Sequence, residues 1–198
     1  MKLKKMFFAR IQSIFLIRFI SLFNIIFGNQ VPCPPYWTSF GPFGCFFFAR
    51  YAGPMDYDTA QEYCQHLYPG GSLAEIHDIK TQYFLMGAIT SMGLKSAYDQ
   101  WWLGADDKFV EGTWYWKSSK KLYPNPQAFH YFGTGEPNNV KEEDCVEMLG
   151  LYTQNYVGEW ITNYHWNDIG CELKKLPICH VKLEEDRYAR FTNNEGRK

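Results

Sequence analysis

Two segments of this 198-residue chain decide how the rest of it is interpreted: Gly135-Glu136-Pro137-Asn138-Asn139, continuing through Glu142-Glu143-Asp144-Cys145, and Trp166-Asn167-Asp168 further along. Their metal-binding side chains end in carboxylate or carboxamide oxygens. Such oxygens suit a hard cation such as Ca²⁺, which takes six to eight of them at roughly 2.3–2.6 Å. Zinc or copper would need imidazole or thiolate, and neither is clustered here. The segments therefore predict a calcium site with five side-chain ligands: Glu136, Asn138, Glu143, Asn167 and Asp168.

The same five side chains predict what the calcium site is for. A Glu ligand can give one oxygen to the metal and accept a hydrogen bond with the other, whereas an Asn ligand keeps its NH₂ as a donor. Two such Glu/Asn couples around one exposed cation match two neighbouring hydroxyls, as in the vicinal diol of a sugar. Glu136-Pro137-Asn138-Asn139 alone is also ordinary turn chemistry. The oxygen-bearing residues form three clusters, at 135–139, 142–145 and 166–168, which flank Cys145 and Cys171. Three such clusters favour a binding site over a simple turn.

These motifs resemble those of the C-type lectin family. The resemblance rests on the segments quoted above and extends from Cys33 to about Lys182, through Ala60-x-x-Tyr63-Cys64, Trp102-Leu103-Gly104 and Pro177-x-Cys179. Mannose-type members carry Glu-Pro-Asn at this place, whereas galactose-type members carry Gln-Pro-Asp. The resemblance implies an α+β, C-type lectin-like domain. It would hold two helices, short and mostly antiparallel strands, a long calcium-binding loop region and three disulfides.

Cysteine usage points to an oxidising compartment. An even number of cysteines, six here, is typical of disulfide-bonded extracellular proteins, but spacing alone does not decide which cysteines pair. Similarity to the family implies three pairs: Cys33–Cys45, Cys64–Cys179 and Cys145–Cys171. The chain has no Cys-x-x-Cys pair, so a redox or zinc role is not expected.

Further expectations concern the auxiliary calcium site and two departures, which follow from the resemblance, and a cis peptide, which follows from proline chemistry. The family's auxiliary calcium site would use Asp107, Glu111, Glu143 and Asp144. Asn139 stands where that site often has Asp, which weakens it, and Phe132 stands where relatives often carry Trp. Pro137 is the natural candidate for a cis peptide, because cis bonds are largely confined to X-Pro.

The ends of the chain differ in composition from its middle. Residues 1–28 combine basic residues with an apolar run and read as a secretory signal peptide, so the protein is expected to be secreted. An uncleaved membrane anchor is the alternative, although Arg18 inside the run would cost about 2.5–3.5 kcal/mol at a bilayer centre. Residues 30–182 would form the lectin domain, and the charged residues 183–198 a disordered tail.

Charge argues against nucleic-acid binding. Residues 1–28 hold five of the 20 basic residues and no acids, so the mature chain has 15 basic and 21 acidic residues, a formal charge of −6. Affinity for nucleic acid depends on Lys and Arg neutralising phosphates. An enzyme is also not expected. Glu136 and Glu143 would need one protonated partner to act as a glycosidase pair, whereas ligands of a shared cation are held ionised.

Hydrophobic periodicity predicts the main elements. Helices are expected near 57–66, capped by Asp56 or Asp58, and near 79–92, capped by Asp78. Strands are expected at 33–37, 44–48, 72–76, 101–105, 114–116, 145–149, 159–161, 166–168 and 177–181. Residues 120–135 would form an irregular loop, and 152–165 is longer and more aromatic than the binding motif requires.

The sequence thus predicts a secreted C-type lectin that binds mannose, fucose or N-acetylglucosamine through Ca²⁺. Its partners would be glycans on cell or microbial surfaces, as in innate immunity, with self-association into a homo-oligomer as a further possibility. The alternative is a C-type lectin-like domain that binds a protein or another surface and uses calcium only structurally.

Overall fold

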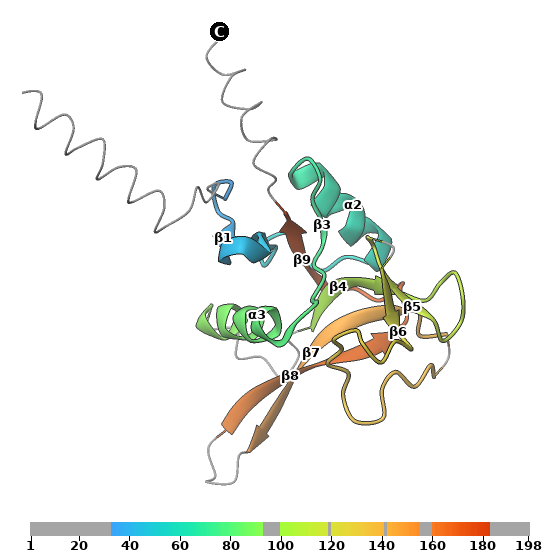
Figure 1. Ribbon diagram of the computed structural model, residues 1–198. Coiled ribbons are helices and arrows are strands. Elements are labelled where there is room, and N and C mark those ends of the chain that lie inside the picture. Colours follow the sequence, from blue (N-terminus) through green and yellow to red (C-terminus); the bar gives the residue numbers. More distant parts are fainter. Residues whose placement is uncertain (1–32, 93–99, 119, 141, 155–159, 183–198) are drawn as a thin grey trace, which may run out of the picture. The chain divides into compact units, whose positions relative to one another are not determined.

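The computed structural model describes residues 33–92, 100–118, 120–140, 142–154 and 160–182 (Figure 1). For Lys121 and for residues 151–162 within these ranges it describes the backbone alone. The expected signal peptide and C-terminal tail lie outside the described residues. Within the described ranges, no helix is both long and apolar enough to span a bilayer.

A mixed sheet organises the described chain. Its main path runs β1 (Thr38–Ser39), β2 (Cys45–Phe48), β9 (Leu176–Val181), β4 (Gln100–Asp106), β5 (Trp114–Trp116) and β6 (Lys121–Tyr123). The short strand β3 (Ser72–Leu73) also pairs with β9, β7 (Cys145–Gln154) pairs with β4, and β8 (Trp160–Ile169) pairs with β7. β4 and β9 are parallel, and the other strand pairs are antiparallel. The β7–β8 hairpin extends away from the body of the domain (Figure 1).

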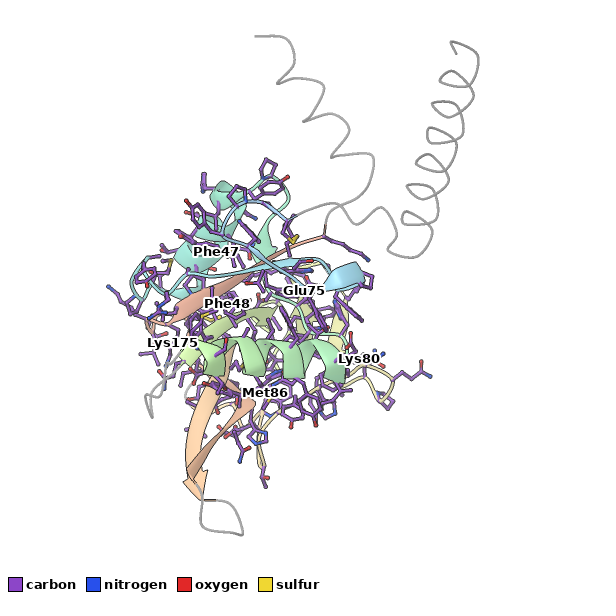
Figure 2. The ribbon with its side chains drawn as sticks, turned by 90° about the vertical axis from the view of Figure 1, so that its left-hand side faces the viewer. Phe47, Phe48, Glu75, Lys80, Met86 and Lys175 are labelled. Atoms are coloured by element: carbon purple, nitrogen blue, oxygen red, sulfur yellow. A yellow bond between two sulfur atoms is a disulfide. The ribbon has the colours of Figure 1, made fainter. Side chains whose placement is uncertain are left out.

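Two helices, α2 (Tyr57–Leu67) and α3 (Ile79–Ser91), begin where the sequence predicts. Asp56 caps α2 by accepting the Thr59 N–H at 3.0 Å, and Asp78 caps α3 by accepting the Thr81 N–H at 2.9 Å. Each cap satisfies a backbone donor that the first helical turn leaves without a partner. Both helices bury one apolar stripe, since Ala60 and Cys64 on α2 are fully buried, as are Leu85 and Ile89 on α3. Figure 2 looks onto α3, whose half-buried Met86 packs against the core.

The three disulfides are those that the resemblance implies. Cys33 pairs with Cys45, Cys64 with Cys179, and Cys145 with Cys171. The second bridge spans 115 positions and ties α2 to β9. Closing so long a loop contributes roughly 4–5 kcal/mol in the chain-entropy model.

Three of the expected strands differ from the structure. Residues 33–37 form a turn, with the Trp37 N–H donating to the Pro34 carbonyl at 3.0 Å. Pro34 and Pro35 have no N–H to give to a sheet, which explains why the strand starts only at Thr38. The expected short strands at 159–161 and 166–168 are one strand, β8, which pairs without a break from Trp160 opposite Gln154 to Ile169 opposite Cys145.

Candidate functional site

The loop between β6 and β7 is held against β8 by one buried carboxylate. Asp168 on β8 is fully buried, and it accepts the backbone N–H groups of Asn138 at 3.1 Å and Asn139 at 2.6 Å. Further toward β6, the Gly133 N–H donates to the Trp166 carbonyl at 2.9 Å. The Glu136–Pro137 peptide is cis, as expected from the sequence. The loop residues Glu136 and Asn138 are therefore fixed beside Asp168, although they lie far from it in the sequence.

Glu136 is the centre of a group of carboxyl groups. Its Oε2 atom is buried and has no hydrogen-bond partner. Burial raises the pKa of Glu136, as do the close approach of its carboxyl group to that of Asp168 and the negative charges of Asp168 and Glu143. The Asn138 side chain has the opposite effect because it donates to the carboxylate. Four of the five predicted ligands thus lie close enough to act on one another.

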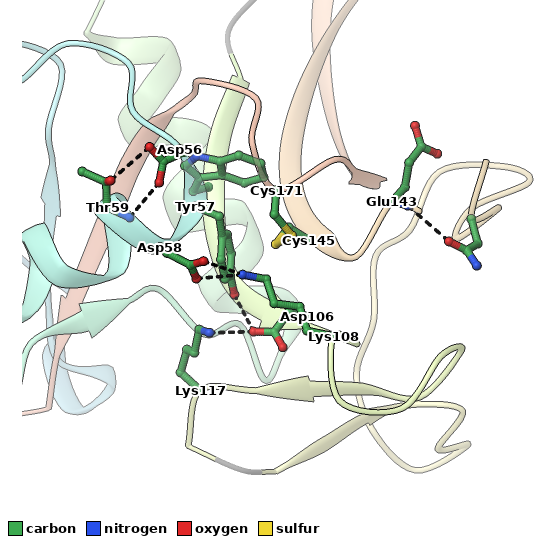
Figure 3. The surroundings of a disulfide bond; sticks show 12 residues. Asp56, Tyr57, Asp58, Thr59, Asp106, Lys108, Lys117, Glu143, Cys145 and Cys171 are labelled. Carbon is green, nitrogen blue, oxygen red and sulfur yellow. Dashed lines mark hydrogen bonds and ion pairs between the residues drawn. A yellow bond between two sulfur atoms is a disulfide. The ribbon is translucent and has the colours of Figure 1, made fainter. Parts of the chain in front are cut away.

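Asn138 and Glu143 face each other across a tight turn. The Val140 N–H donates to Asn138 Oδ1 at 2.9 Å and to Glu143 Oε2 at 3.2 Å. The Glu143 N–H in turn donates to Asn139 Oδ1 at 3.2 Å (Figure 3). Cys145 follows two residues later, and its disulfide to Cys171 lies near Glu143 in the same view. The turn thus leads directly into a covalently fixed strand.

The fifth predicted ligand, Asn167, makes a different contact. It lies on β8 directly opposite Glu147 of β7, and its Nδ2 donates to Glu147 Oε1 at 3.1 Å. This hydrogen-bond partner is a residue of the neighbouring strand and not of the loop that carries Glu136 and Asn138. Asn167 and Asp168 are successive residues of β8, so their side chains leave the strand toward opposite faces.

The predicted auxiliary site also gathers carboxylates. Asp107 is buried, its Oδ2 accepts the Gly112 N–H at 2.8 Å, and its Oδ1 has no partner. The pKa of Asp107 is raised to about 6, chiefly by burial and also by the charges of Glu111 and Asp144, against the effect of the Gly112 hydrogen bond. Glu111 Oε1 accepts a hydrogen bond from the Asn139 side chain, which connects this site to the first.

A divalent cation fits both places on chemical grounds. Each contains a buried carboxylate oxygen without a donor, and each raises the pKa of that carboxyl through neighbouring negative charge. A bound cation would satisfy the oxygen and offset the repulsion. In the described part of the chain, no three or more His, Cys, Asp and Glu side chains are grouped so that they could hold a metal ion. Amide oxygens and ligand hydroxyls would therefore have to complete the shell, as expected for a hard cation at an exposed site.

Sequence reasoning missed three buried polar residues around the site. Glu147 and Lys175 form an ion pair at 3.2 Å, and Gln82 accepts the Trp166 Nε1–H at 2.9 Å. The signal for Glu147 was present in the sequence, because it interrupts the apolar strand Val146-Glu147-Met148 and a buried carboxylate needs a cation. Gln82 has no comparable signal, since it is one polar residue on an otherwise ordinary helix.

Comparisons with known proteins agree with this architecture. Residues 53–181 match the Lectin C-type domain family. The CD209 antigen of Symphalangus syndactylus is 33% identical over 150 residues, which is 76% of this chain and 33% of that protein. The chain therefore spans about a third of that relative's length.

Solved structures give the same fold. The cow carbohydrate-recognition domain of CD23, studied in the presence of a GlcNAc2Man3 oligosaccharide, is 25% identical, with a TM-score of 0.58 over 77% of this chain and 98% of that one. A calcium-independent type II antifreeze protein is 22% identical, with a TM-score of 0.57 over 78% and 98%. C-type lectin domains typically bind Ca²⁺, but the fold alone does not require it. On the family match, the fold and the three disulfides, this chain belongs to the C-type lectin domain family, whose members are generally non-enzymatic carbohydrate-binding proteins.

Proposed function

We propose that this domain binds carbohydrate through Ca²⁺, with a preference for mannose, fucose or N-acetylglucosamine. The observation that carries the proposal is the buried Glu136 Oε2, which has no donor and lies beside the charges of Asp168 and Glu143. A carboxylate oxygen that is buried without a donor is unfavourable unless a cation compensates it. The site opens to solvent, because Asn138 and Asn139 on the same turn are exposed.

The metal and the protein side chains would each bind the sugar hydroxyls in a different way. When bound, calcium would supply a Lewis acid that accepts a lone pair from each of two adjacent sugar hydroxyls. Glu136 and Glu143 accept hydrogen bonds from those hydroxyls, and Asn138 and Asn167 donate hydrogen bonds to their oxygens. Asp168 holds the loop in position through its two backbone hydrogen bonds.

The order of donor and acceptor supports mannose-type specificity. In the Glu136-Pro137-Asn138 triplet the acceptor comes first and the donor second, and the family's galactose-type members reverse this order. Glycans on cell or microbial surfaces are the partners that fit, and the chain would meet them as a secreted protein. One structural relative, the cow CD23 domain, was studied with a mannose-containing oligosaccharide, which is consistent with this assignment.

A protein-binding or surface-binding domain is the second candidate. It is favoured by the shared fold of a calcium-independent antifreeze protein. In that case the carboxylate cluster would have no sugar to bind, and the Glu/Asn couples would serve no purpose. The two candidates differ in whether removing calcium abolishes binding.

A glycan array probed with and without EDTA tests the proposal. Wild-type protein should bind mannose-type glycans in calcium and lose them in EDTA. Glu136→Ala should lose them in both conditions, whereas Glu62→Gln, which changes an exposed carboxylate on α2, should behave as wild type. EDTA-resistant binding, or a folded calcium-loaded domain that binds no glycan, would contradict the proposal.

A further inference from the structure

We propose that Glu147 and Lys175 form a buried positioning pair that fixes the side-chain amide of Asn167 for calcium and sugar binding. This inference rests on the proposed function and adds two residues that touch neither the ion nor the sugar. Glu147 is 1% exposed and Lys175 is 7% exposed, so the pair lies inside the domain.

The sheet brings the three residues together. β7 lies between β4 and β8, and Glu147 of β7 is opposite Trp102 on one side and Asn167 on the other. Directly opposed residues on antiparallel strands project to the same face, which allows the 3.1 Å hydrogen bond from Asn167 Nδ2 to Glu147 Oε1. Lys175 Nζ lies 3.2 Å from the other carboxylate oxygen, Glu147 Oε2.

Lys175 is itself held in a fixed place. It directly precedes β9 and is labelled in Figure 2. Its backbone exchanges two hydrogen bonds with Met55, at 3.0 and 2.9 Å, and its ammonium group also donates to Gln100 Oε1. The Met55 carbonyl additionally accepts the Trp102 Nε1–H at 2.8 Å. The cation therefore cannot move away from Glu147 without breaking a network that reaches β4.

The consequence for Asn167 follows from donor and acceptor chemistry. An ionised carboxylate only accepts hydrogen bonds, so the amide nitrogen of Asn167, not its oxygen, must face Glu147. The oxygen and nitrogen positions of a side-chain amide are assigned from the hydrogen-bond partners that surround them. Here Glu147 decides it, which turns Oδ1 away from Glu147 and leaves the second N–H of Nδ2 unused. An oxygen for the metal and an N–H for a hydroxyl are the two functions that the proposed site requires of Asn167.

Lys175 makes this arrangement possible. Its ammonium group lies 3.2 Å from Glu147 Oε2, which holds the carboxylate in place and leaves the other oxygen, Oε1, to accept the Asn167 amide N–H. A buried ion pair is often no more stabilising than apolar residues of similar size. Stability alone therefore does not account for the pair, whereas orientation of a ligand does.

Calcium titration of variants separates the positioning role from a structural one. Gln at position 147 can either donate or accept, so Glu147→Gln should weaken calcium binding by about 10- to 100-fold, the usual effect of losing a partner that orients a metal ligand. Ile89→Val is the matched control, because it destabilises the core at α3 by about 0.5–1.5 kcal/mol without touching the site. It should leave calcium affinity unchanged.

A second variant guards against loss of folding. Glu147→Gln combined with Lys175→Met leaves no unpaired buried charge, so it should fold even where Glu147→Gln does not, and it should show the same loss of affinity. In the calcium-free protein, the Asn167 side-chain NH₂ signal, identified by its absence in Asn167→Ser, should shift or broaden in both variants. This readout does not depend on calcium or sugar.

The outcomes distinguish this inference from the proposed function. If wild-type protein binds no calcium, the proposed function fails. If wild type binds calcium and both Glu147 variants bind it equally well, with an unchanged Asn167 signal, the proposed function stands and the positioning pair is overturned.

Discussion

Asp168 has two tasks that a single carboxylate seldom combines. It is proposed to bind the metal, and it accepts two backbone N–H groups of the loop that carries Asn138 and Asn139. Because these hydrogen bonds use both of its oxygens, they hold the loop even without calcium. The loop geometry is therefore expected to survive removal of the ion.

Substituting Asp168 by Asn should separate loop stability from metal binding. Asn keeps one accepting oxygen but presents an NH₂ to the second N–H, which leaves a buried donor unsatisfied. We expect a loss of about 1–3 kcal/mol in the free energy of unfolding of the calcium-free domain, measured by urea denaturation. Asp58→Asn, at a side chain that is 73% exposed, should change it by less than about 1 kcal/mol. Equal effects of the two substitutions would show that Asp168 does not hold the loop.

Exchanging the acceptor and donor of the triplet tests the origin of sugar specificity. Glu136→Gln with Asn138→Asp reverses their order while keeping an oxygen at each position for the metal. We expect weaker mannose binding, a gain of galactose binding and largely unchanged calcium affinity. Titration of the double variant with both sugars measures this change. An unchanged preference for mannose would place specificity elsewhere.

Protons should compete with calcium for the same carboxylates. The pKa of Glu136 is raised, and that of Asp107 is raised to about 6, so both take up protons at higher pH than an ordinary acidic residue. Only the ionised forms bind the metal, so the calcium concentration for half-saturation should rise as the pH falls from 7.5 to 5.5. Calcium titrations at the two pH values measure this. Identical midpoints would mean that these carboxyl groups do not bind the ion.

At the scale of elements, the β7–β8 hairpin sets the site. Five register pairs, from Cys145–Ile169 to Leu149–His165, fix Asn167 and Asp168 relative to β7. The motif Trp166-Asn167-Asp168 could be recognised from the sequence, as could both helix caps, because each depends on a few adjacent residues. The continuity of β8 could not be recognised from the sequence. It depends on pairing with β7, and local periodicity does not show which residues of two strands pair. For the same reason the Glu147–Lys175 pair was missed, since its members are joined only by the fold.

The junction between β9 and the N-terminal strands should be sensitive to acid. His180 on β9 has Nε2 2.8 Å from the Phe43 carbonyl, and its ring stacks on Phe46 at 4.5 Å. Burial lowers the pKa of His180, and the charges of His77 and Lys182 act in the same direction, while the Phe43 hydrogen bond and Glu75 oppose them. Folded protein therefore keeps His180 neutral at a pH where the unfolded chain protonates it.

The sign of the pH dependence follows directly. The unfolded chain takes up a proton near pH 6.5 and the folded one only at lower pH, so stability falls as the pH drops below about 6.5 and levels off once both states are protonated. His180→Gln removes the titrating group and should reduce the difference in urea midpoint between pH 7.5 and 5.5, measured in EDTA. His66→Gln, at an exposed position on α2, should leave that difference unchanged. If His180→Gln also leaves it unchanged, His180 is not the acid-sensitive group.

At the scale of the molecule, one domain presents one proposed sugar site. An exposed ion that contacts two hydroxyls buries little apolar area, so a single domain should bind a monosaccharide weakly. All six cysteines of the chain are used in disulfides within it, which leaves no thiol for a covalent link between copies. Tight binding to a surface would then require several domains held together noncovalently, because multivalency raises the effective concentration without new contacts.

Self-association should therefore be coupled to agglutination. Tyr36, Tyr51 and Phe109 are at least 90% exposed, and large aromatic side chains so placed are candidates for contacts between copies. Sedimentation of the protein in calcium should show oligomers at the concentrations that agglutinate mannan-coated beads. Replacing each aromatic in turn by Asp should identify a variant that sediments as a monomer, still binds soluble mannose and no longer agglutinates. A strict monomer that agglutinates beads would contradict the argument, because a particle with one site cannot crosslink two surfaces.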